Sequence, residues 1–155
     1  MKKKWELFFG AVFLSIFSFT FSGCESMDTF ACPYIISNPR VELGECEKNH
    51  KFAGMHFSFF NESKKDIENF TLCFMLYDSD GNNPFIGSNC IVSRCDWKVR
   101  SGAVVDFIID LDSYLTVVPT EPYQLDYIFV CEINYSDKSC WKDPYGMYCV
   151  REACE

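Results

Sequence analysis

The sequence predicts an all-β domain that folds as a two-sheet antiparallel β-sandwich. Apolar and polar residues alternate at period two in several short segments, as in strands with one buried face. Turn-forming residues such as Asp80-Gly81 separate these segments. The only helical candidate after residue 24 is one weak turn at residues 63–69. Six or seven short strands joined by such turns are typical of a sandwich.

Three strands are expected in the first half of the domain. The strand at residues 34–36 is short, because Asn38-Pro39 is a break signal. The strand at residues 52–60 alternates Met and Phe with His and Ser. The strand at residues 70–77 has Phe or Leu at every second position, and the turn at residues 78–82 closes it.

The second half is expected to add a looser strand at residues 89–99, an alternating strand at residues 104–111 and a long strand after Pro122. A turn at residues 136–139 leads into Cys140-Trp141, before a last short strand near residues 147–150. In the long strand, the residues expected to share one face are Leu125, Tyr127, Phe129, Cys131 and Ile133.

The amino terminus has the three parts of an export signal. Lysines at positions 2–4 precede an apolar run from Leu7 to Phe21, and small residues precede Cys24. As a helix this run would reach about 22 Å, short of the roughly 30 Å hydrocarbon core, so a retained spanning helix is disfavoured. The expected organisation is a cleaved signal peptide at residues 1–23, a membrane tether at residues 24–31 and the β-sandwich at residues 32–155.

The tetrad Phe21-Ser22-Gly23-Cys24 resembles the lipobox of bacterial lipoproteins, whose cysteine receives a diacylglycerol thioether. Phe21 stands where leucine is usual, as in spirochaete-like lipoboxes, and ordinary cleavage near Ser22 is the alternative. Acyl chains such as palmitate on Cys24 would hold the protein on a membrane, since each buried methylene contributes about 0.8 kcal/mol. The resemblance implies a cell-envelope protein on the inner or outer membrane, facing the periplasm or the exterior.

The charge and the missing motifs exclude several function classes. Removing residues 1–23 takes away three lysines and one glutamate, which changes the formal charge from −8 to −10. An acidic surface repels phosphate backbones, so nucleic acid is not an expected partner. The sequence lacks G-x-S-x-G, G-x-G-x-x-G and G-x-x-x-x-G-K-[ST], so no hydrolase or nucleotide signature is present and no cofactor is expected.

Ten cysteines in an exported chain favour disulfide bonds, because oxidising compartments preserve them. If lipid consumes Cys24, an odd number remains, which leaves a free thiol or an intermolecular bridge. The spacings do not determine the connectivity, and reduced buried thiols are an alternative. The candidate disulfide cysteines are Cys32, Cys46, Cys73, Cys90, Cys95, Cys131, Cys140, Cys149 and Cys154.

Metal binding is the weaker interpretation of two patterns. The pairs Cys90-x4-Cys95 and Cys149-x4-Cys154 could together offer four thiolates to zinc, but the chain has no C-x-x-C. Residues 78–82 are acidic but lack the spacing of a calcium loop, so a hairpin turn explains them better. No metal site is therefore expected.

A small secreted hydrolase is the alternative function from a different class. Asp106 and Asp110 share a strand face and Asp112 follows closely, so two carboxylates could act together. A cysteine could also act as a nucleophile with His50 or His56. Outward-facing acids more often keep a strand soluble, and cysteines here are better explained as disulfides, so no catalytic residue is expected.

The segment from Phe57 to Asn82 resembles the FxLYD-type domain of bacterial envelope proteins. Residues 74–78, Phe-Met-Leu-Tyr-Asp, match its core motif, and Asn61-Glu62-Ser63 matches the turn that ends its preceding strand. The resemblance covers residues 52–135 and implies an immunoglobulin-like sandwich, usually without known catalysis. The cysteine density and the tail at residues 140–146 depart from it.

The aromatic residues Trp141, Tyr145 and Tyr148 surround a Pro-Tyr-Gly turn and form a candidate binding patch. Exposed aromatic side chains are favoured in binding sites. The alternative is a hydrophobic lid over the sandwich, pinned by Cys140 and Cys149. The leading hypothesis is a lipid-anchored, non-catalytic module that contacts an envelope or host protein or glycan.

Overall fold

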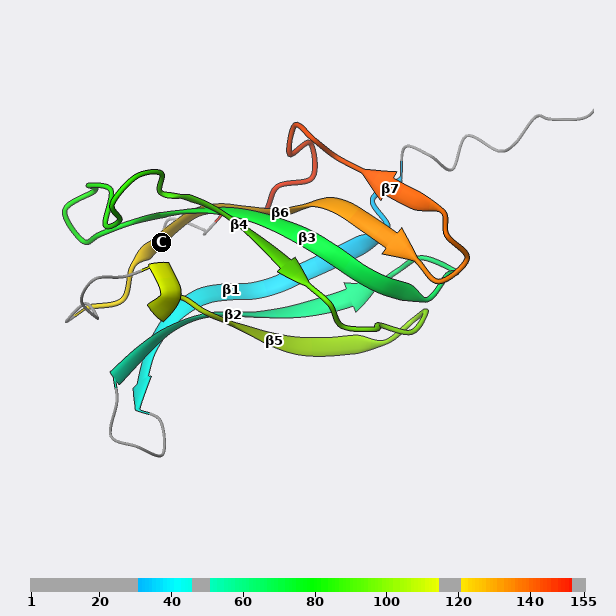
Figure 1. Cartoon of the computed structure of the whole chain (residues 1–155), viewed down its shortest axis with the longest axis horizontal. Coiled ribbons are helices and arrows are strands. Elements are labelled where there is room, and N and C mark those ends of the chain that lie inside the picture. Colours follow the sequence, from blue (N-terminus) through cyan, green and yellow to red (C-terminus); the bar gives the residue numbers. More distant parts are fainter. Residues whose placement is uncertain (1–30, 46–50, 115–120, 152–155) are drawn as a thin grey trace, which may run out of the picture. The chain divides into compact units, whose positions relative to one another are not determined.

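The computed structural model describes residues 31–45, 51–114 and 121–151 (Figure 1). This part contains a 3₁₀ turn at Asp112–Tyr114 and no helix long and apolar enough to cross a membrane. The predicted signal peptide and Cys24, together with Cys46, His50 and Cys154, lie outside the described residues. The strands are β1 (Tyr34–Glu45), β2 (Lys51–Asn61), β3 (Ile67–Tyr77), β4 (Cys90–Cys95), β5 (Val104–Asp110), β6 (Gln124–Tyr135) and β7 (Cys140–Lys142).

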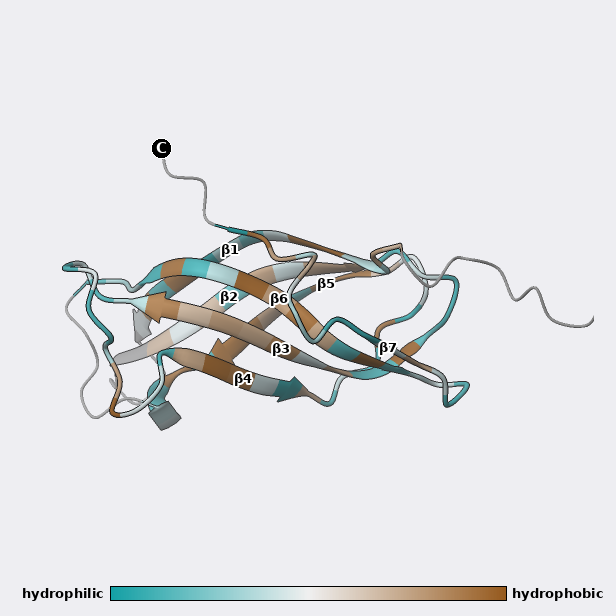
Figure 2. Cartoon of the chain, turned by 90° about the horizontal axis from the view of Figure 1, so that it is seen from above, coloured by the Kyte–Doolittle hydropathy of each residue, from teal (hydrophilic) through white to brown (hydrophobic). Residues whose placement is uncertain are grey.

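These strands confirm the predicted two-sheet antiparallel sandwich. One sheet has the order β1-β2-β5 and the other the order β4-β3-β6-β7, and every paired strand is antiparallel. The two sheets lie over each other as layers (Figures 1 and 2), and in Figure 2 the strands carry most of the hydrophobic colour. The largest fully buried side chains, which fill the space between the sheets, are Phe59, Phe70, Phe74, Met55, Ile67, Leu72, Leu76, Leu111, Ile128, Ile133, Val99 and Val130.

The predicted alternation is confirmed in β2, β3 and β5. Met55, Phe57 and Phe59 of β2 are buried, whereas the intervening side chains are only half-buried. In β5 the buried Phe107 lies between the exposed Asp106 and its exposed neighbour on the other side. Period-two alternation indicates the buried face correctly in these strands, because no extra residue interrupts the segment in which it was predicted. The bulge residue of β3, Glu68, precedes the predicted segment at residues 70–77.

Strand β1 is longer than predicted, because Asn38-Pro39 forms an irregularity within the strand and does not end it. The pairing register with β2 shifts between Ser37 and Arg40, and Asn38 has a φ of 52°. Asparagine tolerates this left-handed conformation better than most residues. β1 is also an edge strand, where a proline without an N–H donor is accommodated at a bulge.

Strand β6 departs from the predicted single face. Asp126 and Cys131 are bulge residues: each stands between two residues of β6 whose partners in β3 are consecutive, so it has no partner of its own in β3. Each bulge reverses the alternation, so Tyr127 and Phe129 lie on the outer face. The side chains of β6 that are buried toward the other sheet are Leu125, Ile128, Val130, Ile133 and Tyr135.

The helical turn predicted at residues 63–69 does not form, because the side chain of Asn61 organises this loop differently. Asn61 Oδ1 accepts hydrogen bonds from the N–H and the hydroxyl of Ser63 at 3.1 and 2.6 Å. Asn61 Nδ2 donates to the carbonyl oxygens of Lys65 and Val99 at 2.9 and 3.0 Å. These side-chain bonds satisfy backbone groups that a helix would otherwise satisfy, so the non-helical loop is favoured.

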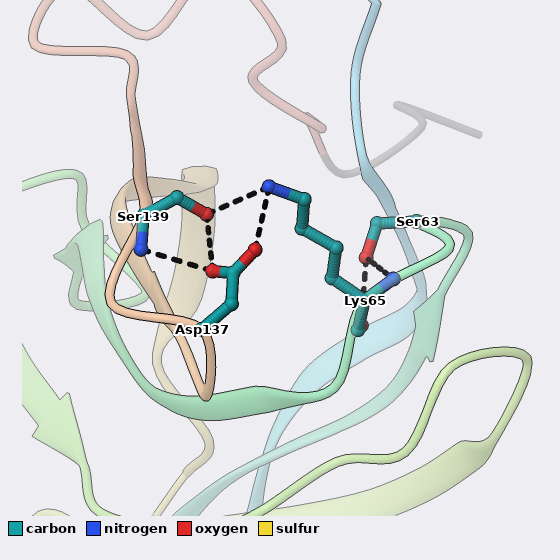
Figure 3. A network of polar contacts seen from close by, with 4 residues as sticks. All are labelled: Ser63, Lys65, Asp137 and Ser139. Carbon is teal, nitrogen blue, oxygen red and sulfur yellow. Dashed lines mark hydrogen bonds and ion pairs between the residues drawn. The ribbon is translucent and has the colours of Figure 1, made fainter.

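A polar network joins this loop to the turn between β6 and β7 (Figure 3). Lys65 Nζ lies 2.9 Å from Asp137 Oδ2 and donates to Ser139 Oγ at 2.8 Å. The N–H of Ser139 donates to Asp137 Oδ1 at 2.9 Å. The hydrogen bond from Lys65 is the main cause that lowers the pKa of Asp137 below its ordinary value, and the bonds from Ser139 add to the effect.

The substitution Asp137→Asn is expected to destabilise the domain slightly near neutral pH and less in acid. Because the folded-state pKa of Asp137 is lowered, its stabilisation is complete above the unfolded pKa of about 3.9 and is lost as the pH falls through the folded value. Urea unfolding of both proteins at about pH 7 and about pH 2 measures the difference. A difference independent of pH would contradict the role assigned to this carboxylate.

Candidate functional site

The C-terminal loop, residues 143–150, is attached to β6 at both ends. The N–H of Asp143 donates to the carbonyl of Cys131 at 3.0 Å. At the other end, Val150 and Ile128 exchange two backbone hydrogen bonds of 2.8 and 2.9 Å. The predicted last strand near residues 147–150 is therefore reduced to one isolated bridge at Val150. Backbone hydrogen bonds to β6 therefore hold both ends of this loop in place.

A buried carboxylate closes this loop at its base. Asp143 is 3% exposed, and its Oδ2 accepts a hydrogen bond from the N–H of Tyr148 at 3.1 Å. A buried acid is costly unless it is hydrogen-bonded, so its presence here indicates that the loop conformation depends on it. In the sequence, the only signal at Asp143 is its position before Pro144, which is typical of a turn.

Two of the three predicted patch residues belong to a hydrophobic lid. The ring of Trp141 contacts Tyr34 edge-on at a centroid distance of 5.7 Å and lies 5.9 Å from the ring of Tyr148. Tyr34 is buried, and its hydroxyl accepts a hydrogen bond from the N–H of Val130 at 3.0 Å. Burial raises the pKa of Tyr34 above its ordinary value, so this hydroxyl stays neutral.

Tyr145, the third predicted patch residue, is exposed to solvent. Its side chain is 88% exposed, and that of Met147 is 66% exposed. Gly146 between them has a φ of +66°, and a Cβ on it would lie 3.1 Å from the ring of Phe129. The glycine therefore lets the backbone rest on Phe129 while its neighbours face solvent. The structure thus separates the predicted patch into a packed base and an exposed tip.

The outer face of the four-stranded sheet carries a cluster of three cysteines and a tyrosine. The sulfur atoms of Cys73 in β3 and Cys90 in β4 lie 3.2 Å apart. Tyr127 donates a hydrogen bond to Cys90 Sγ at 3.6 Å, and Cys131 Sγ donates to the carbonyl of Thr71 at 3.4 Å. Burial is the main cause that raises the pKa of Cys73 to about 12.

The other described cysteines lie apart from this contact. Cys95 is buried in the core and Cys32 Sγ donates to the carbonyl of Tyr34 at 3.1 Å. Cys140 and Cys149, which were expected to pin the lid, are both exposed. The seven described cysteines are free thiols in the structure.

Strand β4 places the two cysteines of its x4 pair on opposite faces. Cys90 is half-buried on the outer face, whereas Cys95 packs in the core. Within the described ranges, no group of three or more His, Cys, Asp or Glu side chains is placed to hold a metal. In the turn considered for calcium, Asp78 Oδ1 accepts the N–H groups of Asp80 and Asn82 at 3.0 and 2.7 Å, which is a turn cap.

The carboxylates considered for hydrolysis are engaged in local hydrogen bonds. Asp106 accepts a hydrogen bond from the hydroxyl of Ser58. Asp110 accepts from the N–H of Asp112 at 2.8 Å, and Asp112 accepts from the N–H of Ala53 at 3.1 Å. The first bond joins paired residues of β2 and β5, and the other two hold the end of β5 and the turn that follows it.

The comparisons with known proteins support the fold alone. The chain is similar to the protein in a 1.85 Å X-ray structure of a hypothetical protein from Peptoclostridium difficile 630, with a TM-score of 0.50 and 14% identity. The match covers 73% of this chain and 87% of that one. Neither a protein-family model nor a curated protein matches the sequence.

Proposed function

We propose that this protein is a lipid-anchored lipoprotein of the bacterial cell envelope whose β-sandwich is a non-catalytic binding module. The observation that carries the binding role is the exposed Tyr145 on a loop whose base is held by the buried Asp143. Tyrosine and tryptophan are enriched among the residues that dominate binding energy. A loop already fixed before binding loses little conformational freedom when a partner arrives.

The chemistry of the exposed tip favours a partner with an apolar or ring-shaped surface. Tyr145 and Met147 are both exposed, and together they offer one aromatic ring and one adaptable thioether. An envelope or host protein, or a glycan with exposed sugar faces, has such a surface. The resemblance of residues 52–135 to FxLYD-type domains supports the same class of envelope module.

The anchor in this proposal is Cys24. The basic start, the apolar run and the small residues before Cys24 support cleavage and acylation at that position. Several acyl chains would give stable attachment, because one chain alone binds membranes only weakly. The sandwich would then face the periplasm or the exterior.

Photocrosslinking in intact cells tests the binding role. With a photoreactive phenylalanine analogue in place of Tyr145, we expect a discrete crosslinked product. The same analogue at Tyr114, which is 42% exposed in the 3₁₀ turn, is the matched control and should not give that product. Identical product patterns from the two positions would contradict the proposed site.

The substitution Tyr145→Ala is expected to weaken binding of the crosslinked partner by at least about tenfold. The melting temperature should not change, because Tyr145 is exposed and is not part of the core. Trp141→Ala is expected to lower the melting temperature, because Trp141 packs against Tyr34. Pull-down with the purified variants and thermal unfolding separate the two effects. Unchanged capture by Tyr145→Ala would remove this tip from the proposal.

Detergent phase partitioning tests the anchor. The wild type is expected in the detergent phase and Cys24→Ser in the aqueous phase, because only the wild type can be acylated at that position. Equal partitioning of the two proteins would contradict lipid attachment at Cys24.

A further inference from the structure

The contact between Cys73 and Cys90 depends on how β3 and β4 are paired. Cys73 is opposite Val92 and Cys90 is opposite Met75, so the two cysteines are diagonal neighbours on antiparallel strands. Both side chains lie on the outer face, where their sulfur atoms are 3.2 Å apart. Diagonal neighbours across a pair of strands are within reach of each other on the same face.

We propose that Cys73 and Cys90 form a disulfide bond that fastens the edge strand β4 to β3, while Cys131 stays a thiol. A disulfide has an S–S distance of about 2.05 Å, so the two sulfurs need to approach by about 1 Å. Diagonal neighbours have Cα atoms about 7–8 Å apart, slightly beyond the roughly 4.4–6.8 Å of a disulfide, so a small shift of the edge strand β4 toward β3 accompanies the rotation of the two side chains. The export in the proposed function is needed only for the bond to persist in the cell.

The surroundings favour this pair over the other described cysteines. Cys131 is also on the outer face, but its sulfur is directed to the carbonyl of Thr71. Cys95 is on the opposite face of β4, within the core. Cys73 and Cys90 are the described pair whose sulfur atoms are in contact.

The bond forms by exchange with a disulfide donor, such as oxidised glutathione or a dithiol-disulfide oxidoreductase. The thiolate of Cys90 attacks one sulfur of the donor, which releases a thiol and leaves a mixed disulfide. Cys73 then loses its proton and attacks Cys90 Sγ, which releases the second thiol. Two protein thiols become one disulfide, and the donor takes up the two electrons and the two protons.

The environment assigns these roles to the two cysteines. Cys90 is half-buried and accepts a hydrogen bond from Tyr127, so it is the more accessible of the two cysteines. Cys73 is 9% exposed, and burial raises its pKa to about 12. A protonated and covered thiol is a poor first nucleophile, which leaves Cys73 to resolve the mixed disulfide.

The bond would constrain an edge strand of the four-stranded sheet. β4 pairs only with β3 and is connected to it by residues 78–89. The cysteines are 17 positions apart, and closing a loop of this length is expected to raise the melting temperature by about 10 °C.

Peptide mass spectrometry of the purified full chain tests the pairing. Trypsin cuts after lysine and arginine, so residues 66–94 form one peptide that contains Cys73, Cys90 and no other cysteine. After oxidation with glutathione disulfide and alkylation without reductant, this peptide is expected to carry no alkyl group and to be two hydrogens lighter than its reduced form. A double-alkylated peptide, or one linked to residues 101–138 through Cys131, would overturn the proposal.

Single substitutions test the order of attack. Cys73→Ser is expected to trap one glutathione on Cys90, whereas Cys90→Ser should leave Cys73 unmodified until the protein is unfolded. Cys131→Ser is the matched control and should keep the bond. Equal trapping by Cys73→Ser and Cys90→Ser would refute the assigned roles. These measurements use purified protein, so their failure is distinct from a failure of the envelope-binding proposal.

The contribution to stability is measured on the oxidised wild type and the Cys73→Ser, Cys90→Ser double variant. The double variant is expected to melt about 10 °C lower. If the bond is present by mass spectrometry and the two melting temperatures are equal, the bond does not fasten β4 as proposed.

Discussion

Replacing Phe59 with alanine is expected to destabilise the domain by about 4 kcal/mol. Phe59 is fully buried, and its ring stacks on Phe70 at 4.6 Å and on Tyr34 at 5.7 Å. The ring of Phe107 meets it edge-on at 6.2 Å. Phe59 in β2 therefore connects residues of β1, β3 and β5, so its loss leaves a cavity between both sheets. A loss of this size is a large fraction of the stability of a small domain.

Urea unfolding of Phe59→Ala measures this loss, and Phe60→Ala is the matched control. Phe60 follows Phe59 in β2 but points to the other face, where it is only half-buried. Its removal is expected to cost about 1 kcal/mol or less. Similar losses for the two variants would show that the aromatic stack is not the centre of stability that its geometry indicates.

The sequence was sufficient for the strands whose buried face follows from alternation alone. β2, β3 and β5 have their expected inner faces, because local pattern and burial coincide there. The errors in β1 and β6 have one physical cause. A bulge is decided by pairing with a distant strand, so neither the register shift at Asn38 nor the extra residues Asp126 and Cys131 could be deduced from local alternation.

The residues of the candidate site could be predicted from the sequence, but their arrangement in space could not. The aromatic residues of the C-terminal tail were apparent, yet their separation into a base at Trp141 and a tip at Tyr145 depends on the contact of Gly146 with Phe129. That contact exists because the bulge at Asp126 turns Phe129 outward. The sulfur contact between Cys73 and Cys90 likewise requires the register of β3 and β4, which the cysteine spacing does not contain.

Replacing Asn61 with alanine is expected to destabilise the domain by about 2 to 3 kcal/mol, although the residue lies at the end of a strand. Asn61 is fully buried, and its side chain makes four hydrogen bonds to Ser63, Lys65 and Val99. The carbonyl of Val99 keeps a second bond from the N–H of Ile67, so the loss is smaller than four complete bonds. The remaining cost comes from poorly satisfied buried groups and from the cavity.

Two further variants separate these causes by urea unfolding. Asn61→Leu fills the volume without the hydrogen bonds and is expected to be as destabilised as Asn61→Ala, because the polar groups around it stay poorly satisfied. Asn134→Ala removes an amide whose described partners are the side chains of Asn69 and Glu132, which are only half-buried and can bind water instead. It should cost less than about 1 kcal/mol. A stable Asn61→Leu would mean that the site needs volume and not polarity. The loop at residues 62–66 would then be held by its other bonds, such as those of Lys65 to Asp137 and Ser139.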